Sequence, residues 1–219
     1  MAASPIFVGT WRNEATVFIA AHGTALALPV FTAGSSGARV HAIAVANTDA
    51  GANTALLYYA KRMTLQSAMG TGAFLNNGGS PDTITRTSGS FVDDGWLIGD
   101  RLLVSDPTTL ANSFFVTLTV VAALTLTFVT GTTDTAENLP TGAIMYKLAQ
   151  LHLTTLAINA GNAAATDALD LLGADMPTVD VSPDRYLTIE ADDALVMSLG
   201  TAPGASPDRV DVMVGGGDY

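Results

Sequence analysis

The sequence contains no cysteine among its 219 residues. Disulfide bonds, thiolate chemistry and zinc sites with cysteine ligands are therefore excluded. The redox compartment stays open, because a chain without cysteine suits reducing and oxidising surroundings equally.

Basic side chains are also scarce. Nine Lys and Arg residues stand against 20 Asp and Glu residues, which gives a formal net charge of -11. A protein that binds duplex nucleic acid needs a basic patch to displace counterions from the phosphates. The one run of basic residues is the pair Lys61-Arg62, so we expect no nucleic acid partner.

The longest apolar stretch, SFFVTLTVVAALTLTFVTG at residues 113–131, is long enough to raise the question of a membrane helix. Apolar residues alternate with threonine on both sides of Ala122-Ala123, which is the period of a strand. The pattern predicts a β-hairpin with one apolar and one threonine face, and we expect no membrane partner. The first residues lack a basic region followed by an apolar run, so no signal peptide is expected.

Charged residues make up only 13% of the chain, whereas hydrophobic residues make up 48%. An average globular protein has about 25% charged residues. A subunit that buries part of its surface against neighbours needs fewer solvating side chains. The composition therefore favours a component of an assembly.

Short runs with a period of two, separated by Gly, Asn, Asp and Pro, recur along most of the chain. This pattern predicts an all-β protein. Strands are expected at residues 15–21, 24–34 and 39–46, and the run at 54–63 is expected to be the hairpin partner of 39–46. One short helix is predicted at residues 162–173, because this segment is rich in alanine and ends at a glycine.

Two loops, at residues 67–82 and 133–142, enclose about four closely spaced strands, enough for a small barrel or sandwich. Insertion of such a module into a loop costs a host domain little. We therefore predict a discontinuous, jelly-roll-like β-sandwich formed by residues 1–78 and 143–219. Residues 79–142 would form an inserted small β-barrel or β-sandwich module.

Asp93 and Asp94 are candidates for paired acids or metal ligands. Adjacent residues of a strand point to opposite faces, so their carboxylates converge only where the chain turns. The following Gly95 favours a turn, which Asp-Asp-Gly also forms for purely structural reasons. We interpret both acids, and the pair Asp192-Asp193, as turn residues, and we expect Asn at position 93 or 94 to change stability only modestly.

No other constellation indicates chemistry. His22, His41 and His152 are isolated, without the HExxH spacing of zinc proteases. The glycine-rich stretches at residues 33–38 and 70–79 depart from the nucleophile-elbow and dinucleotide-binding patterns. We predict no catalytic, cofactor-binding or metal-binding residues, no cofactor and no enzymatic activity. A divalent ion held between subunits stays an open alternative, because of the acidic surplus.

Aromatic residues have two expected roles. Trp96 is expected in the core of the inserted module, together with Phe91, Leu97 and Leu103. Trp11 suits either a core or an arm that anchors on a neighbouring subunit.

The N-terminal stretch SPIFVGTW concentrates apolar residues where a chain is usually mobile. Exposed aromatics on a free end are costly, and aromatic anchors concentrate binding energy at interfaces. The candidate interface residues are therefore Pro5, Ile6, Phe7 and Trp11.

Residues 84–106, ITRTSGSFVDDGWLIGDRLLVSD, and the following FVTLTVVAALTLTFV resemble a small β module of tailed-bacteriophage virion proteins. The flanking stretches LPVFTAGSSGARVHAIAVANTDAGANTALLYYA, LAINAGNAAATDALDLL and VMVGGGDY are similar to another type of phage structural protein. Strand and turn signatures carry the resemblance, so it implies a virion part and transfers no functional residue.

Within the virion, our first hypothesis is a capsid decoration or cement protein that stabilises the phage head. Its partners would be the major capsid protein and further copies of itself, as a trimer. Its location would be the virion, assembled in the bacterial host cytoplasm. The alternatives are a tail, neck or fibre-adaptor protein and, more remotely, a carbohydrate-binding β-sandwich or a hydrolase. Sugar binding is disfavoured because aromatics make up 7% of the chain and form no clustered platform.

Overall fold

A computed structural model shows a chain made almost entirely of strands and turns, in two antiparallel sheets. The predicted all-β, sandwich-like fold is therefore confirmed. The structure describes residues 10–20, 27–63, 70–77, 81–105, 115–128, 136–139, 144–158, 169–170, 187–205 and 208–219.

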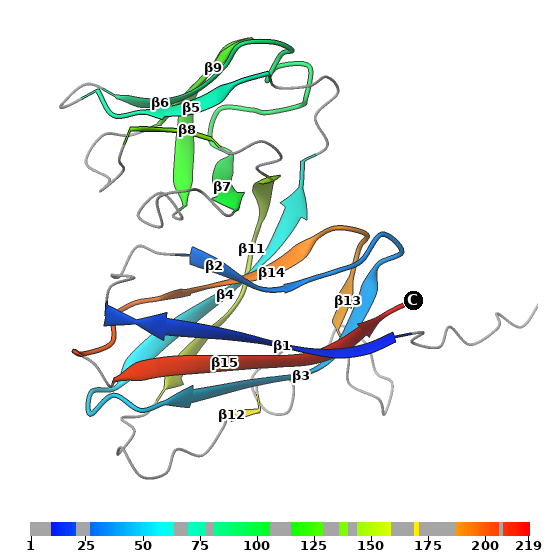
Figure 1. Cartoon of the computed structure of the whole chain (residues 1–219), viewed down its shortest axis with the longest axis vertical. Coiled ribbons are helices and arrows are strands. Elements are labelled where there is room, and N and C mark those ends of the chain that lie inside the picture. The colour runs from blue at the N-terminus through cyan, green and yellow to red at the C-terminus, as the bar shows by residue number, and fades with distance from the viewer. Residues whose placement is uncertain are drawn as a thin grey trace, which may run out of the picture. The chain divides into compact units, whose positions relative to one another are not determined.

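The chain divides into two compact units, and Figure 1 labels most of their strands. Unit 1 comprises residues 1–24, 29–59 and 151–219, and unit 2 comprises residues 25–28 and 60–150. The predicted module of residues 79–142 lies within unit 2, which extends beyond it on both sides. The boundary falls inside three strands, β2 (Ala27–Thr32), β4 (Asn53–Arg62) and β11 (Ile144–Ile158).

The first sheet of unit 1 has the order β1-β15-β3-β12, and β13 also pairs with β3. The register places Met213 opposite both Ala15 and Ala44. A bulge between Gly215 and Gly216 leaves His41 as the extra residue of β3. The strands are β1 (Thr10–Ile19), β3 (Ala38–Asn47), β12 (Leu169–Asp170), β13 (Leu187–Ile189) and β15 (Arg209–Asp218).

The second sheet contributes strands to unit 1 in the order β11-β4-β14-β2, with β2 at Ala27–Thr32 and β14 at Ala194–Leu199. β3 and β4 therefore lie in different sheets, and the predicted hairpin between them is wrong. Each strand buries alternate residues. That pattern suits two strands that face each other across a core as well as two that pair in one sheet.

Apolar side chains from the two sheets form the core of unit 1. On β15, three alternate valines are fully buried, and β3 contributes buried residues at the same spacing. The buried side chains of the first sheet include Phe18, Val40, Ile43, Val45, Ile189, Val210, Val212 and Val214, and those of the second include Val30, Phe31, Leu57, Leu195, Val196, Met197 and Leu199.

Unit 2 has the strand order β10-β5-β6-β9-β8-β7-β11. The predicted hairpin is confirmed as β8 and β9, where Ala122 N–H donates to the carbonyl of Thr125 at 2.9 Å. Among the described residues, no helix is long and apolar enough to cross a membrane. The strands are β5 (Gly72–Leu75), β6 (Asp82–Arg86), β7 (Arg101–Ser105), β8 (Val116–Val121), β9 (Thr125–Phe128) and β10 (Glu137–Asn138).

The core of unit 2 contains Trp96, as the sequence predicts. Phe91 and Leu103 are also fully buried, but Leu97 is 63% exposed, so its predicted place in the core is wrong. The core cluster comprises Phe74, Ile84, Phe91, Trp96, Leu102, Val104, Val116, Leu118, Leu126, Phe128, Leu139 and Met145.

The helix predicted at residues 162–173 lies largely outside the described residues. Its two described residues, Leu169 and Asp170, form β12 opposite Val45 and Ala44. Pairing with β3 satisfies their backbone groups, and such tertiary contacts override a local helix propensity.

Phe128→Ala should test the core of unit 2. Phe128 is fully buried, so we expect a loss of about 3–5 kcal/mol in the free energy of unfolding. Urea denaturation followed through Trp96 fluorescence measures this loss. Val120→Ala on the paired strand is the control, because Val120 is exposed and its change should stay within about 0.5 kcal/mol. Equal losses in the two variants would contradict the assignment of this core.

Candidate functional site

β1 reverses the usual arrangement of polar and apolar side chains at a protein surface. Its alternate residues Arg12, Glu14 and Thr16 make contacts with β2. The residues that alternate with them are exposed on the opposite side, and they include Trp11 and Val17. A half-buried antiparallel sheet normally turns apolar residues inward and polar residues outward. The inward polar groups of β1 therefore need partners.

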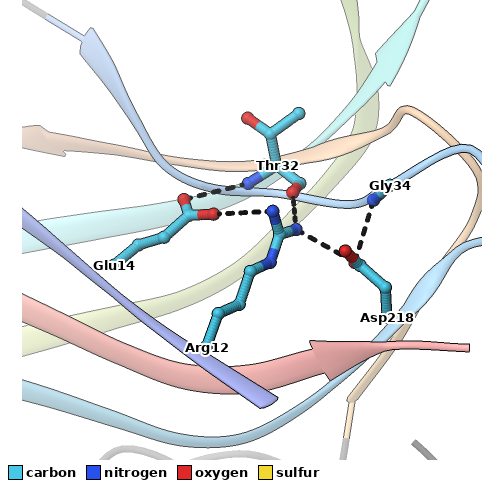
Figure 2. Close-up of polar contacts among 5 residues, drawn as sticks. All are labelled: Arg12, Glu14, Thr32, Gly34 and Asp218. Carbon is cyan, nitrogen blue, oxygen red and sulfur yellow. Dashed lines mark hydrogen bonds and ion pairs between the residues drawn. The ribbon is translucent and has the colours of Figure 1, made fainter. Parts of the chain in front are cut away.

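The guanidinium of Arg12 lies between two carboxylates, as Figure 2 shows. Its Nη1 is 3.2 Å from Oε1 of Glu14, and its Nη2 is 3.1 Å from Oδ1 of Asp218 on β15. Nη2 also donates to the carbonyl of Thr32 on β2. Cζ lies 4.6 Å from the ring centroid of Phe31, in the geometry of a cation–π contact. One cation is thus shared by three strands.

Side chains of β1 also satisfy backbone groups of β2. The carboxylate of Glu14 accepts a hydrogen bond from Thr32 N–H at 3.3 Å, and the hydroxyl of Thr16 donates to the carbonyl of Pro29 at 3.3 Å. A strand with unpaired backbone groups recruits other strands. These contacts protect β2 from such pairing.

Asp218 fixes the turn that follows β2. Its carboxylate accepts a hydrogen bond from Gly34 N–H at 3.0 Å (Figure 2). A Cβ atom at Gly34 would lie 2.9 Å from the carboxylate carbon, closer than real Cβ atoms approach. A larger residue at position 34 would therefore require the carboxylate of Asp218 to shift.

Burial raises the pKa of Glu14 above its ordinary value of 4.5, and Asp218 adds to the rise. The charge of Arg12 and the hydrogen bond from Thr32 oppose it, but desolvation is the larger effect. The folded chain therefore holds the proton more tightly than the unfolded chain does. The resulting contribution to stability is present below pH 4.5 and is lost as the pH rises through the folded pKa.

The outward side chains of β1, β15 and β3 form a surface that we call the outer face. Trp11 and Met213 are 67% and 58% exposed on it. Small residues lie between the large ones: Met213 is opposite Ala15 and Ala44 in the register. The outer face is thus mostly apolar around Met213, and its described side chains are Trp11, Asn13, Ala15, Val17, Ile19, Arg39, Ala42, Ala44, Ala46, Arg209, Asp211 and Met213.

Charged side chains lie toward the two ends of the outer face. At one end, Nε of Arg209 is 2.9 Å from Oδ2 of Asp211. At the other end, Nε of Arg39 donates to the hydroxyl of Tyr219 at 2.9 Å. Asp211 lies opposite both Val17 and Ala46 in the register, so a charged side chain borders Met213 on β15, and among the described residues only the rows of Gly215 and Met213 lack a charge.

Trp11 is the candidate interface residue that the structure describes. It lies near the start of β1, and its ring centroid is 5.1 Å from that of His41. Of the two roles left open for Trp11, its exposure excludes the core. Pro5, Ile6 and Phe7 lie outside the described residues.

Asp93 and Asp94 have different environments, although both lie in the predicted turn. Asp93 is exposed, with its N–H bonded to the hydroxyl of Ser90. Asp94 is fully buried, and its Oδ2 is 2.5 Å from Nη1 of Arg86, which is equally buried. Arg86 also lies 4.8 Å from the ring centroid of Phe91. Asp94 therefore lies in the predicted turn, but it also forms a buried ion pair that the turn interpretation did not include.

The other acidic pair does form the predicted turn, between β13 and β14. Asp192 has a positive φ of 63°, and Asp193 is buried. The hydroxyl of Tyr59 donates to Oδ2 of Asp193 at 2.7 Å and accepts from Glu190 N–H at 3.1 Å. Burial, followed by the hydrogen bond to Asp193, raises the pKa of Tyr59. This tyrosine therefore stays neutral and ties β4 to the turn.

Within the described ranges, no group of three or more His, Cys, Asp and Glu side chains could hold a metal ion. His41 is the bulged residue of β3. His22 and the side chain of His152 lie outside the described part of the chain.

Comparison of the chain with protein-family models and with curated protein sequences gives no match.

Glu14→Gln should change how stability depends on pH. As the pH falls toward 4.5, the melting temperature of the native protein should rise relative to that of the variant, because Glu14 takes up a proton and a glutamine at this position does not. At pH 7 the two should differ by less than about 1 kcal/mol, since glutamine can still accept from Thr32. Melting curves between pH 4 and pH 8 measure the difference. Asn13→Ala, which changes an outward side chain of the same strand, is the control, and its melting temperature should depend on pH as that of the native chain does. If the melting temperature of the Glu14→Gln variant also follows the native dependence on pH, the raised pKa of Glu14 is refuted.

Asp94→Asn should lower the free energy of unfolding by about 3–5 kcal/mol, because it leaves the buried Arg86 without its counter-charge. Asp93→Asn, one residue away and exposed, should change it by no more than about 0.5 kcal/mol. Chemical denaturation of both variants gives the comparison. A small effect at both positions would restore the turn interpretation.

Proposed function

We propose that this chain is a non-enzymatic structural protein of a tailed-bacteriophage virion, most directly a capsid decoration protein. It binds the outer surface of the head through the major capsid protein and associates with further copies of itself, as a trimer. The resemblance of its strand and turn signatures to phage virion proteins supports the class of particle.

The reversed pattern of β1 is the structural observation that carries the proposal. Arg12 and Glu14 face inward, and Trp11 and Val17 on the same strand face outward. Exposed Trp side chains in a contiguous apolar surface are typical of protein contacts. The outer face therefore suits packing against another protein.

The chemistry of the outer face sets what it binds. Full burial of an exposed Met or Ile side chain gives about 1.5–3 kcal/mol, the half-exposed Met213 and Ile19 give less each, and their sum must exceed the entropy lost on association. The alanines between the large side chains let a second flat surface approach closely. The net charge of -11 would steer the chain toward basic patches on a coat protein and speed its encounter with them.

Trp11→Ser combined with Met213→Ser should weaken binding to purified empty heads of the phage that encodes the chain. We expect a loss of at least roughly tenfold in affinity, because exposed aromatic and Met anchors concentrate interface energy. Co-sedimentation with heads measures affinity, and light scattering measures the oligomeric state. Leu75→Ser is the matched control, an exposed apolar residue that lies on β5 rather than on the outer face.

A native chain that stays monomeric at high concentration and does not bind heads would refute the decoration role. Binding to tails alone would transfer the proposal to a tail, neck or fibre-adaptor protein. Binding on a glycan array, or turnover of a substrate, would favour the carbohydrate-binding or hydrolase alternative.

A further inference from the structure

Unit 2 exposes apolar side chains on the turn that leads into β7. Leu97 and Ile98 are adjacent in sequence and 63% and 70% exposed, and Val92 is exposed on the same segment. Trp96, between them, points into the core. Core packing therefore uses only part of the apolar content of this turn and leaves the remainder in contact with solvent.

The hairpin of β8 and β9 adds further exposed apolar residues beside this turn. Phe91 N–H donates to the carbonyl of Ala123 at 2.8 Å, and Gly99 N–H donates to the carbonyl of Leu118 at 2.8 Å. These bonds hold the turn alongside the hairpin. We call the exposed side chains of the two segments the apolar tip, and they are Val92, Leu97, Ile98, Val120 and Leu124.

Contacts of two acidic residues hold the turn of the apolar tip in place. Asp94 is anchored by its buried ion pair with Arg86. The carboxylate of Asp100 accepts a hydrogen bond from Leu97 N–H at 2.8 Å and lies 2.6 Å from Nζ of Lys147. The turn before Leu97 is therefore fixed on both sides of Trp96.

Two glycines complete the turn. Gly95 and Gly99 have φ values of 89° and 90°, a conformation that other residues rarely adopt. A Cβ atom at either position would meet nothing within 4 Å, so the backbone angle, and not crowding, explains the need for glycine. Glycine at these two positions lets the backbone form the turn without strain.

The buried ion pair has a role beyond stability. Apolar residues of similar volume often stabilise a core as well as a buried ion pair does. The ion pair between Arg86 and Asp94 also holds the backbone of the turn next to the exposed Asp93 and Val92. Their geometry is suited to presenting a defined surface.

We propose that the apolar tip is a second contact surface, which inserts into an apolar depression with a basic rim on the coat-protein lattice. This inference rests on the proposed function and assigns unit 2 its own contact with the head. Asp93 is the exposed acid of the turn, so a basic rim would complement it. Two copies meeting tip to tip about a twofold axis would bring their Asp93 side chains together, which disfavours self-association there.

Two surfaces on one chain also bear on affinity. The outer face belongs to unit 1 and the apolar tip to unit 2. Linked contacts strengthen attachment when both can engage, so each surface would add to the binding of the other. Loss of either surface should therefore reduce binding strongly without abolishing the fold.

Leu97→Ser combined with Ile98→Ser tests the apolar tip. Both side chains are exposed, so far-UV circular dichroism and Trp96 fluorescence should match those of the native chain. Binding to purified empty heads should weaken by at least roughly tenfold. Leu75→Ser, in the same unit but outside the tip, is the matched control and should bind as the native chain does.

Asp93 supplies an electrostatic readout in the same assay. Asp93→Lys should weaken binding more than Asp93→Asn does, and the difference should shrink as salt is raised, because a charge at the rim acts through a screened field. If both variants bind equally well at low salt, the proposal that the binding site on the coat protein has a basic rim is overturned.

The outcomes separate this inference from the proposed function. If the native chain binds heads and the double serine variant binds equally well, the tip contact is overturned and the decoration role stands. If the native chain does not bind heads, both are overturned. Serine-sensitive binding to phosphatidylcholine vesicles, or serine-sensitive self-association, would also overturn the inference, in favour of a membrane or a second copy.

Discussion

The polar cluster around Arg12 is the constraint on which unit 1 depends. Its guanidinium contacts Glu14, Asp218 and the carbonyl of Thr32, so one charge joins β1, β15 and β2. A partly buried cation must keep its partners, because an unpaired charge away from water is costly. The cluster therefore fixes which side of β1 faces inward.

The consequence of that constraint is an apolar outer face. Because alternate residues of a strand point to opposite sides, turning Arg12 and Glu14 inward turns Trp11 and Val17 outward. Unit 2 shows the same relation with different elements. There the buried pair of Arg86 and Asp94 fixes a turn that exposes Leu97 and Ile98. In both units, charge placed inside accompanies apolar surface placed outside.

This relation gives the composition a structural reason. Only 13% of the residues are charged, and several of those charges are used in contacts that hold strands and turns together. Few then remain to solvate the surface, and the outer face and the apolar tip are exposed as a result. Surfaces of this kind are typical of chains that work in contact with other proteins, which is the basis of both proposals.

The sequence by itself determined the fold class, the hairpin of β8 and β9 and the burial of Trp96, because a period of two and turn residues are local signals. It did not determine the sheet of β4, the burial of Asp94 or the exposure of Leu97. Alternation shows that a strand has two faces but not which one is buried. That choice depends on partners distant in the sequence, such as Asp218 for Arg12, and only the tertiary structure brings them together.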